Sequence, residues 1–133
     1  MKALYEIAEQ NSIDIDYFPM KVLKGLSIPG AIALNPKLID TQQEEREILA
    51  HELGHQMRYA FYRFSDSDIT KARAEERANR WAVMQLVPID ELQKAFKSGC
   101  TMIWQLAEYF NVSDKFMQNV IRIYRVKGEV DPS

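Results

Sequence analysis

The chain has 133 residues, 47% of them hydrophobic and 27% charged, which is typical of one globular domain that can bury a core without disulfides. Its formal net charge of −2 argues against a protein that works mainly by neutralising nucleic-acid phosphates. The single cysteine, the absence of a signal-peptide pattern and the absence of an apolar run long enough to span a membrane predict a cytoplasmic protein.

The first third of the chain predicts one helix followed by a small sheet. Residues 1–11 have the apolar spacing of a short amphipathic helix. β-branched and aromatic residues between 13 and 22 predict one or two short strands. Gly25 is expected in a turn. Residues 30–35 then predict a further strand, so the order of elements is that of an α+β domain.

The rest of the chain predicts helices separated by short breaks. Thr41, followed by Glu44, is a good N-terminal cap for a helix that extends to about residue 62. Further helices are predicted over residues 71–87, 89–97, 101–110 and 114–127. We find no linker long enough to divide the chain. We therefore predict a single domain over 1–128, with the helical hairpin 101–127 as part of it and 129–133 as a tail.

A pair of histidines on the predicted helix after Thr41 indicates a metal site. His51 and His55 lie one helical turn apart, so both imidazoles can reach the same ion, which is why His-Glu-x-x-His binds zinc. They are the only histidines in the chain. Glu52 is placed to take a proton from a metal-bound water. Gly54 allows another backbone to approach the helix closely.

The pattern also restricts the third metal ligand. A catalytic zinc site normally has three protein ligands and a water, so a carboxylate or Cys100 must complete it. We favour Glu75, which shares a stripe of the predicted helix 71–87 with small alanines, and keep Glu76 as the alternative. Asn79, one turn after Glu75, is placed to orient a ligating imidazole.

With these motifs in place, the chain resembles the ImmA/IrrE family of metallopeptidases over about residues 20 to 125. The resemblance rests on four segments, namely Gly30 to Pro36, His51 to His55, Glu75 to Ala82 and Leu86 to Pro88. It implies a zincin-like α+β fold. Such a fold has a small mixed or antiparallel sheet, an active-site helix that carries the histidines, and a mostly helical C-terminal half.

The resemblance also implies a function. The protein would be a zinc-dependent endopeptidase of a phage, bacterium or mobile element that cleaves a partner helix-turn-helix transcriptional repressor. His51, His55 and Glu75 would bind one zinc ion per chain, with Glu76 as the alternative third ligand. Glu52 would be the catalytic acid and base. We expect a protein substrate and neither a membrane nor a nucleic-acid partner, and the oligomeric state is left open.

The mechanism expected for such a site is hydrolysis by a zinc-bound water whose pKa is lowered towards about 7. Glu52 would take the proton of this water and then protonate the leaving amine. The substrate is expected to add as a strand at a sheet edge, for which residues 30–35 are the candidate. The donor that stabilises the oxyanion is left open among Arg58, Tyr59 and Tyr62, which are expected on the histidine helix.

Two features allow other interpretations. Residues 101–127 resemble a DNA-binding helix-turn-helix, but their four basic and two acidic side chains leave a charge excess too small for a duplex reader, so we interpret them as a helical hairpin. The aromatic residues between 59 and 64 suggest a docking surface, although core packing is expected for most of them. The alternative function is a non-proteolytic metal-containing regulatory or toxin–antitoxin-type protein that acts by binding protein or, as the less favoured mode, DNA.

Overall fold

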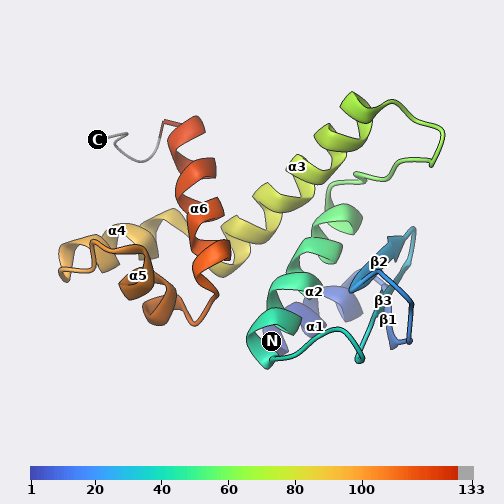
Figure 1. The fold of residues 1–133 in the computed structure, drawn as a ribbon, viewed down its shortest axis with the longest axis horizontal. Coiled ribbons are helices and arrows are strands. Elements are labelled where there is room, and N and C mark those ends of the chain that lie inside the picture. Colours follow the sequence, from blue (N-terminus) through green and yellow to red (C-terminus); the bar gives the residue numbers. More distant parts are fainter. Residues whose placement is uncertain (129–133) are drawn as a thin grey trace. The chain divides into compact units, whose positions relative to one another are not determined.

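The computed structural model describes residues 1–128, and the predicted tail at 129–133 lies outside them. The predicted α+β class is confirmed, because six helices and a three-stranded mixed sheet are present in the described part of the chain (Figure 1). The elements are α1 (Lys2–Gln10), β1 (Asp14–Tyr17), β2 (Gly25–Ile28), β3 (Ala31–Leu34), α2 (Gln42–Met57), α3 (Asp68–Leu86), α4 (Ile89–Lys97), α5 (Ile103–Phe110) and α6 (Asp114–Val126). None of these helices is both long enough and apolar enough to cross a membrane.

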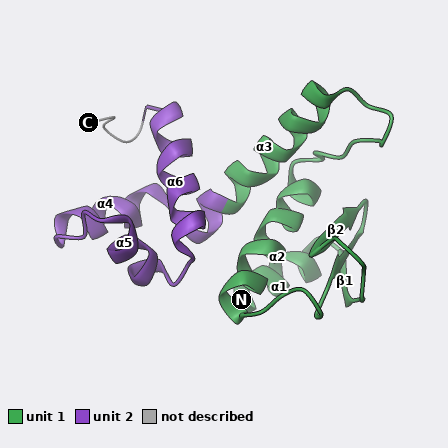
Figure 2. Ribbon diagram, in the orientation of Figure 1, with its two compact units in different colours: residues 1–82 green, residues 83–133 purple. Residues whose placement is uncertain are grey.

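The chain divides into two compact units (Figure 2). Unit 1 covers residues 1–82 and contains the sheet, α1, α2 and most of α3. Unit 2 begins at residue 83 and contains α4, α5 and α6. The expectation of one domain over 1–128 stays a prediction.

The sheet has the strand order β1-β3-β2, so β3 is its central strand. β1 pairs with β3 in parallel, and β2 pairs with β3 in the antiparallel direction. The expectation that residues 30–35 form the sheet edge is therefore wrong. Strand β1 pairs along one side of β3 and strand β2 along the other, which leaves β1 and β2 as the two edges of the sheet.

One face of the sheet lies against α2, which contacts both β2 and β3. Ile32 and Leu34 of β3 are buried on this face. The register pairs Ser27 with Ile32 and Gly25 with Leu34, and paired residues share a face of the sheet. Strand β2 therefore directs Gly25 and Ser27 towards α2, the helix that carries the histidines.

Helix α2 begins as predicted but ends earlier. The Thr41 hydroxyl accepts a hydrogen bond from the Glu44 amide at 3.0 Å, which caps the first turn. The predicted end near residue 62 is wrong, because the helix ends at Met57. Tyr59 has a φ of 51°, and the Ala60 amide donates back to the His55 carbonyl oxygen at 2.9 Å, which is the geometry of a Schellman cap.

Unit 2 is a set of helices around an apolar core. Helices α5 and α6 contact each other across a turn in which Asn111 has a left-handed φ of 53°. The Ser113 hydroxyl accepts from the Phe116 amide and caps α6. The Tyr124 hydroxyl donates to the Val87 carbonyl oxygen at 2.7 Å, which satisfies the polar end of a side chain that is only 1% exposed.

Candidate metal centre

The site is built on two helices whose backbones approach each other closely. A Cβ added at Gly54 of α2 would lie 2.4 Å from the carbonyl oxygen of Ala78 in α3, a distance that no side chain can adopt. The predicted packing role of Gly54 is therefore confirmed. Because this contact lies one turn from His51 on α2 and one turn from Glu75 on α3, it brings the two groups of predicted ligands within reach of each other.

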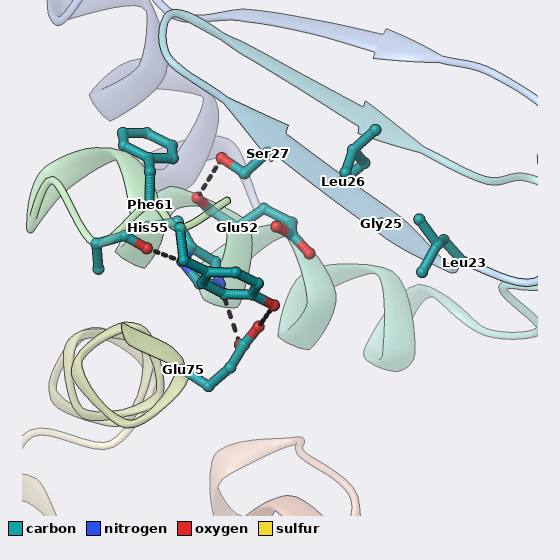
Figure 3. Close-up of a pocket in the computed structure, with 10 residues that line it drawn as sticks. Leu23, Gly25, Leu26, Ser27, Glu52, His55, Phe61 and Glu75 are labelled. Atoms are coloured by element: carbon teal, nitrogen blue, oxygen red, sulfur yellow. Dashed lines mark hydrogen bonds and ion pairs between the residues drawn. The ribbon is translucent and has the colours of Figure 1, made fainter. Parts of the chain in front are cut away.

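Three of the predicted ligands come together in the structure. The Glu75 Oε2 atom lies 2.8 Å from His51 Nε2 and 3.1 Å from His55 Nε2. The two Nε2 atoms are 3.2 Å apart. This arrangement can hold a metal ion. Figure 3 shows His55 on α2 and Glu75 on α3 directed towards the same space.

The outer nitrogen of each imidazole is hydrogen-bonded to an oxygen. His51 Nδ1 lies 2.8 Å from Asn79 Oδ1, in the arrangement predicted for Asn79. His55 Nδ1 lies 2.6 Å from the Ala60 carbonyl oxygen. A carbonyl oxygen only accepts, so each Nδ1 is the donor and carries a proton. The Nε2 atoms of the neutral rings are then free to offer a lone pair to a metal.

The donor set and its spacing fit zinc. Two imidazole nitrogens and a carboxylate oxygen are among its usual ligands, and bonds of about 2.0–2.1 Å in a tetrahedral site place neighbouring ligand atoms roughly 3.3 Å apart. The three atoms observed here are 2.8 to 3.2 Å apart, so a small outward shift would accommodate the ion. All three atoms bear lone pairs, which is a stable arrangement only around positive charge.

The pKa shifts of Glu75 and His55 also indicate that positive charge is favoured between these atoms. Without a metal ion, a proton on Nε2 can supply that charge, and hydrogen bonds from the His51 and His55 rings then hold the pKa of the Glu75 carboxyl well below its usual range. Burial, the largest single effect on His55, lowers its pKa, but the hydrogen bonds to Glu75 and Ala60 outweigh burial and leave the pKa above its usual value. Glu75 is thus held as an anion beside His55, whose raised pKa favours the charged form of its ring.

Glu52 lies beside this cluster without joining it. The side chain is only 8% exposed, and burial raises the pKa of its carboxyl against the opposing effect of His51 and His55. A buried carboxyl with a raised pKa has the properties of a general base that can later act as an acid.

Strand β2 contributes two residues that the sequence did not identify. A Cβ at Gly25 would lie 2.9 Å from Glu52 Oε2, so this glycine leaves room for the carboxylate. The Ser27 hydroxyl donates to the Glu52 carbonyl oxygen at 3.1 Å and ties the strand to α2 (Figure 3). Gly25 was expected in a turn, and only the strand register, which the sequence does not display, places it here.

The alternative third ligands lie elsewhere. The Glu76 carboxylate is 3.8 Å from Arg80 Nε on the same helix and takes no part in the cluster. Cys100 is also outside the cluster, and its Sγ lies 3.9 Å from the Ser98 hydroxyl.

The expectation that the three candidate oxyanion donors lie on α2 is wrong. All three lie in or after its C-terminal cap. The Tyr62 hydroxyl donates to Glu75 Oε1 at 2.7 Å, and this hydrogen bond raises the pKa of Tyr62 to about 12. Tyr59 is 82% exposed, and the Arg58 carbonyl oxygen accepts a hydrogen bond from Arg77. Of the three, Tyr62 alone lines the cavity at the site.

The expectation that the aromatic segment would pack in the core is wrong for most of its members. Phe64 is 96% exposed and Tyr62 is 40% exposed, in addition to Tyr59. Because α2 ends at Met57, the segment continues as a connection without regular structure and does not turn its rings inward as a helix would. Lys71 Nζ lies 4.9 Å from the centre of the Phe64 ring.

A cavity of about 250 Å³ opens beside the cluster, with polar groups from α2 and α3 on one side and strand β2 on the other. Its lining residues are Leu23, Gly25, Leu26, Ser27, Glu52, His55, Ala60, Phe61, Tyr62 and Glu75 (Figure 3). The space therefore joins a possible metal position, a buried carboxyl and the edge of a sheet.

Comparison with known proteins places this site in a family context. The family model described as the IrrE N-terminal-like domain, Peptidase_M78, matches residues 4–122. The match bears out the resemblance drawn from the sequence motifs. No curated protein sequence matches the chain.

Proposed function

The chain belongs to the IrrE N-terminal-like family, Peptidase_M78, and is a metallopeptidase; from this premise we propose that it is a zinc-dependent endopeptidase that cleaves a partner protein. The observation that carries the proposal is the convergence of His51 Nε2, His55 Nε2 and Glu75 Oε2 beside the buried carboxyl of Glu52.

The choice of zinc, and of a catalytic site, rests on the ligand count and on the adjoining space. Structural zinc sites are usually closed by four protein ligands rich in cysteine, whereas catalytic sites keep one position open. Here only three candidate ligands come together, none of them is a cysteine, and two of them, His55 and Glu75, line the cavity. When bound, zinc supplies Lewis acidity that polarises the peptide carbonyl and lowers the pKa of a water to about 7.

The chain's own residues handle the protons. Glu52 accepts the proton of the attacking water and delivers it to the leaving amine nitrogen, a role that its raised pKa favours. Asn79 and Ala60 keep the Nδ1 protons of the two histidines in place, so the Nε2 lone pairs stay directed at the metal position. Gly25 keeps the space beside the Glu52 carboxylate open.

The edge of strand β2 is the proposed binding site for an extended substrate segment. Among the described residues, β2 pairs only with β3, so its other edge presents backbone donors and acceptors. This edge lines the same cavity as Glu52 and His55. A peptide that adds to β2 as a further strand would carry its backbone past the catalytic carboxyl. Strand β2 thereby replaces residues 30–35 as the candidate edge.

A helix-turn-helix transcriptional repressor is the proposed substrate. The support is the resemblance to the ImmA/IrrE family, which implies such a partner. The mode of binding adds a requirement, because strand addition needs a segment of the repressor that can become extended, such as a connection between folded parts.

The test is to incubate the repressor encoded beside this gene with zinc-loaded wild type and with Glu52→Gln, and to read fragments by intact mass. We expect a single cut by the wild type, metal binding by both proteins, and at least a 10²-fold slower cut by the variant, because general acid–base catalysis contributes about 10²–10⁴-fold.

Near wild-type cleavage by Glu52→Gln would contradict the assigned role of Glu52. If the wild type binds one zinc per chain and cuts neither the repressor nor an unfolded test protein such as casein, the alternative stands, namely a metal-containing regulator that acts by binding protein.

A further inference from the structure

Each of the three candidate metal ligands makes a hydrogen bond to one further group through the nitrogen or oxygen that does not face the metal position. Asn79 accepts from His51, and the Ala60 carbonyl oxygen accepts from His55. The corresponding partner of Glu75 is the Tyr62 hydroxyl, at 2.7 Å from Oε1. The role of Asn79 was predicted from the sequence, whereas Tyr62 was predicted only as a possible oxyanion donor. The contact with Glu75 assigns Tyr62 a different task.

Tyr62 reaches Glu75 because of the way in which α2 ends. The left-handed conformation of Tyr59 turns the chain back, and the Ala60 amide donates to the His55 carbonyl oxygen. This turn brings the Ala60 carbonyl oxygen onto His55 Nδ1 and sends the following residues across the cavity. The same short segment therefore supplies the outer partners of two ligands from different helices.

The contact divides the two oxygens of the carboxylate between different partners. Oε1 accepts from Tyr62, and Oε2 faces both Nε2 atoms. Glu75 is 38% exposed, so its side chain has space in which to rotate. A glutamate that is free to rotate loses rotamer entropy when it binds an ion and can present either or both oxygens. The hydroxyl on Oε1 removes part of that freedom in advance.

We propose that Tyr62 is a positioning residue that holds Glu75 so that Oε2 alone binds the metal, an inference that rests on the proposed metallopeptidase site. The ring of Tyr62 also approaches His55, with ring centroids 6.4 Å apart, but the task belongs to the hydroxyl. Removing the hydroxyl leaves the ring in place and frees the carboxylate to swing or to bind through both oxygens.

The experiment compares Tyr62→Phe with wild type and with Tyr59→Phe. The control also removes one hydroxyl from a tyrosine of the same segment, but Tyr59 lies outside the cavity at the metal site. Zinc affinity is measured by competition with a chromophoric chelator. We expect Tyr62→Phe to bind zinc about 10 to 100 times more weakly, the usual effect of losing an outer partner of a metal ligand, and Tyr59→Phe to bind as the wild type does.

Two further measurements separate positioning from a general structural role. The visible absorption of bound Co²⁺ reports coordination number, and we expect it to change in Tyr62→Phe and not in Tyr59→Phe. In a Glu75→Ala background, Tyr62→Phe should have no further effect on zinc affinity, because the hydroxyl acts through that carboxylate. Circular dichroism of the metal-free proteins should be the same for all the variants.

The outcomes also distinguish this inference from the proposed function. Wild type that binds zinc and cleaves protein, together with unchanged zinc affinity and Co²⁺ absorption in Tyr62→Phe, would overturn the inference and leave the function standing. A fall in kcat with zinc affinity unchanged would assign Tyr62 to the oxyanion instead and would also overturn it. Wild type that binds no metal would overturn both.

Discussion

Units 1 and 2 differ in what they bury. The buried polar and charged residues of the described chain, which are Asn35, Glu52, His55 and Gln56, all lie in unit 1. Unit 2 buries apolar side chains and Tyr124, whose hydroxyl is paired with a backbone oxygen. Burying a polar group costs free energy unless hydrogen bonds compensate, so such groups are retained where they have a task.

Two of the buried polar residues in unit 1 hold strand β2 at its ends. Asn35 Nδ2 donates to the carbonyl oxygens of Met20 and Leu23, just before the strand. Gln56 donates to the carbonyl oxygen of Ile28, the last residue of the strand, and accepts from the Gly30 amide just after it. In the described residues no buried side-chain nitrogen or oxygen lacks a partner.

The difference in buried residues indicates that the two units have different roles. Directional hydrogen bonds in unit 1 fix the position of β2 relative to the helix that carries Glu52, and this position determines where a peptide can lie. Apolar packing in unit 2 stabilises helices without specifying such a position. Substitutions next to the metal site in unit 1 should therefore disturb metal binding as well as stability, whereas substitutions in unit 2 should affect stability alone.

The largest expected effect comes from truncating a core leucine in each unit. Leu53 and Leu106 are 0% and 2% exposed, so replacement by alanine should lower the free energy of unfolding by about 2–5 kcal/mol in either case. Only Leu53→Ala, beside Glu52, should also weaken zinc binding by the folded protein. Urea unfolding of the metal-free proteins and chelator competition measure the two effects. Weaker zinc binding in folded Leu106→Ala would break the comparison.

A smaller effect is expected when a glycine in each unit is replaced by alanine. Gly54→Ala places a Cβ against the backbone of Ala78 and should cost about 1–3 kcal/mol while separating the histidines from Glu75. Gly99 has no atoms near its Cβ position but a φ of 101°, so Gly99→Ala should cost about 1–2 kcal/mol through backbone strain. Zinc affinity should fall in Gly54→Ala only. Equal affinities in the two variants would argue against α2–α3 spacing as the determinant of the site.

The smallest effect concerns two matched helix caps. Thr41 caps α2 in unit 1 and Ser113 caps α6 in unit 2, through hydroxyl contacts of 3.0 and 3.1 Å. Replacing either with alanine should lower the free energy of unfolding by about 1 kcal/mol. Thr41 lies more than two helical turns before His51, and Ser113 belongs to unit 2, so neither variant should alter zinc affinity. A shift in zinc affinity for Thr41→Ala alone would show that the start of α2 also positions the site.

Much of the site could be predicted because it depends on neighbours within one helix. His51, Glu52 and His55 have fixed relative positions on any α-helix, and Glu75 and Asn79 are related in the same way on α3. The start of α2 followed from Thr41, whose side chain accepts a hydrogen bond from the amide three residues ahead. These relations need no knowledge of the rest of the fold.

The errors arose where distant segments compete or meet. Whether residues 30–35 form an edge or the centre of the sheet depends on which other strands pair with them, and the resulting register alone brings Gly25 to Glu52. The end of α2 depended on the left-handed conformation of Tyr59. Glycine favours this conformation, so a tyrosine gives no sign of it in the sequence.

The sequence by itself therefore determined the chemistry of the centre, namely two histidines, a neighbouring glutamate and a carboxylate one helix further on. Only the tertiary structure decided which strand edge lies beside that chemistry and which hydroxyl donates to the candidate third ligand. The physical reason is that side-chain spacing along a helix is set by local backbone geometry. Strand order, and the contact between Tyr62 and Glu75, depend on the packing of segments that are separated along the chain.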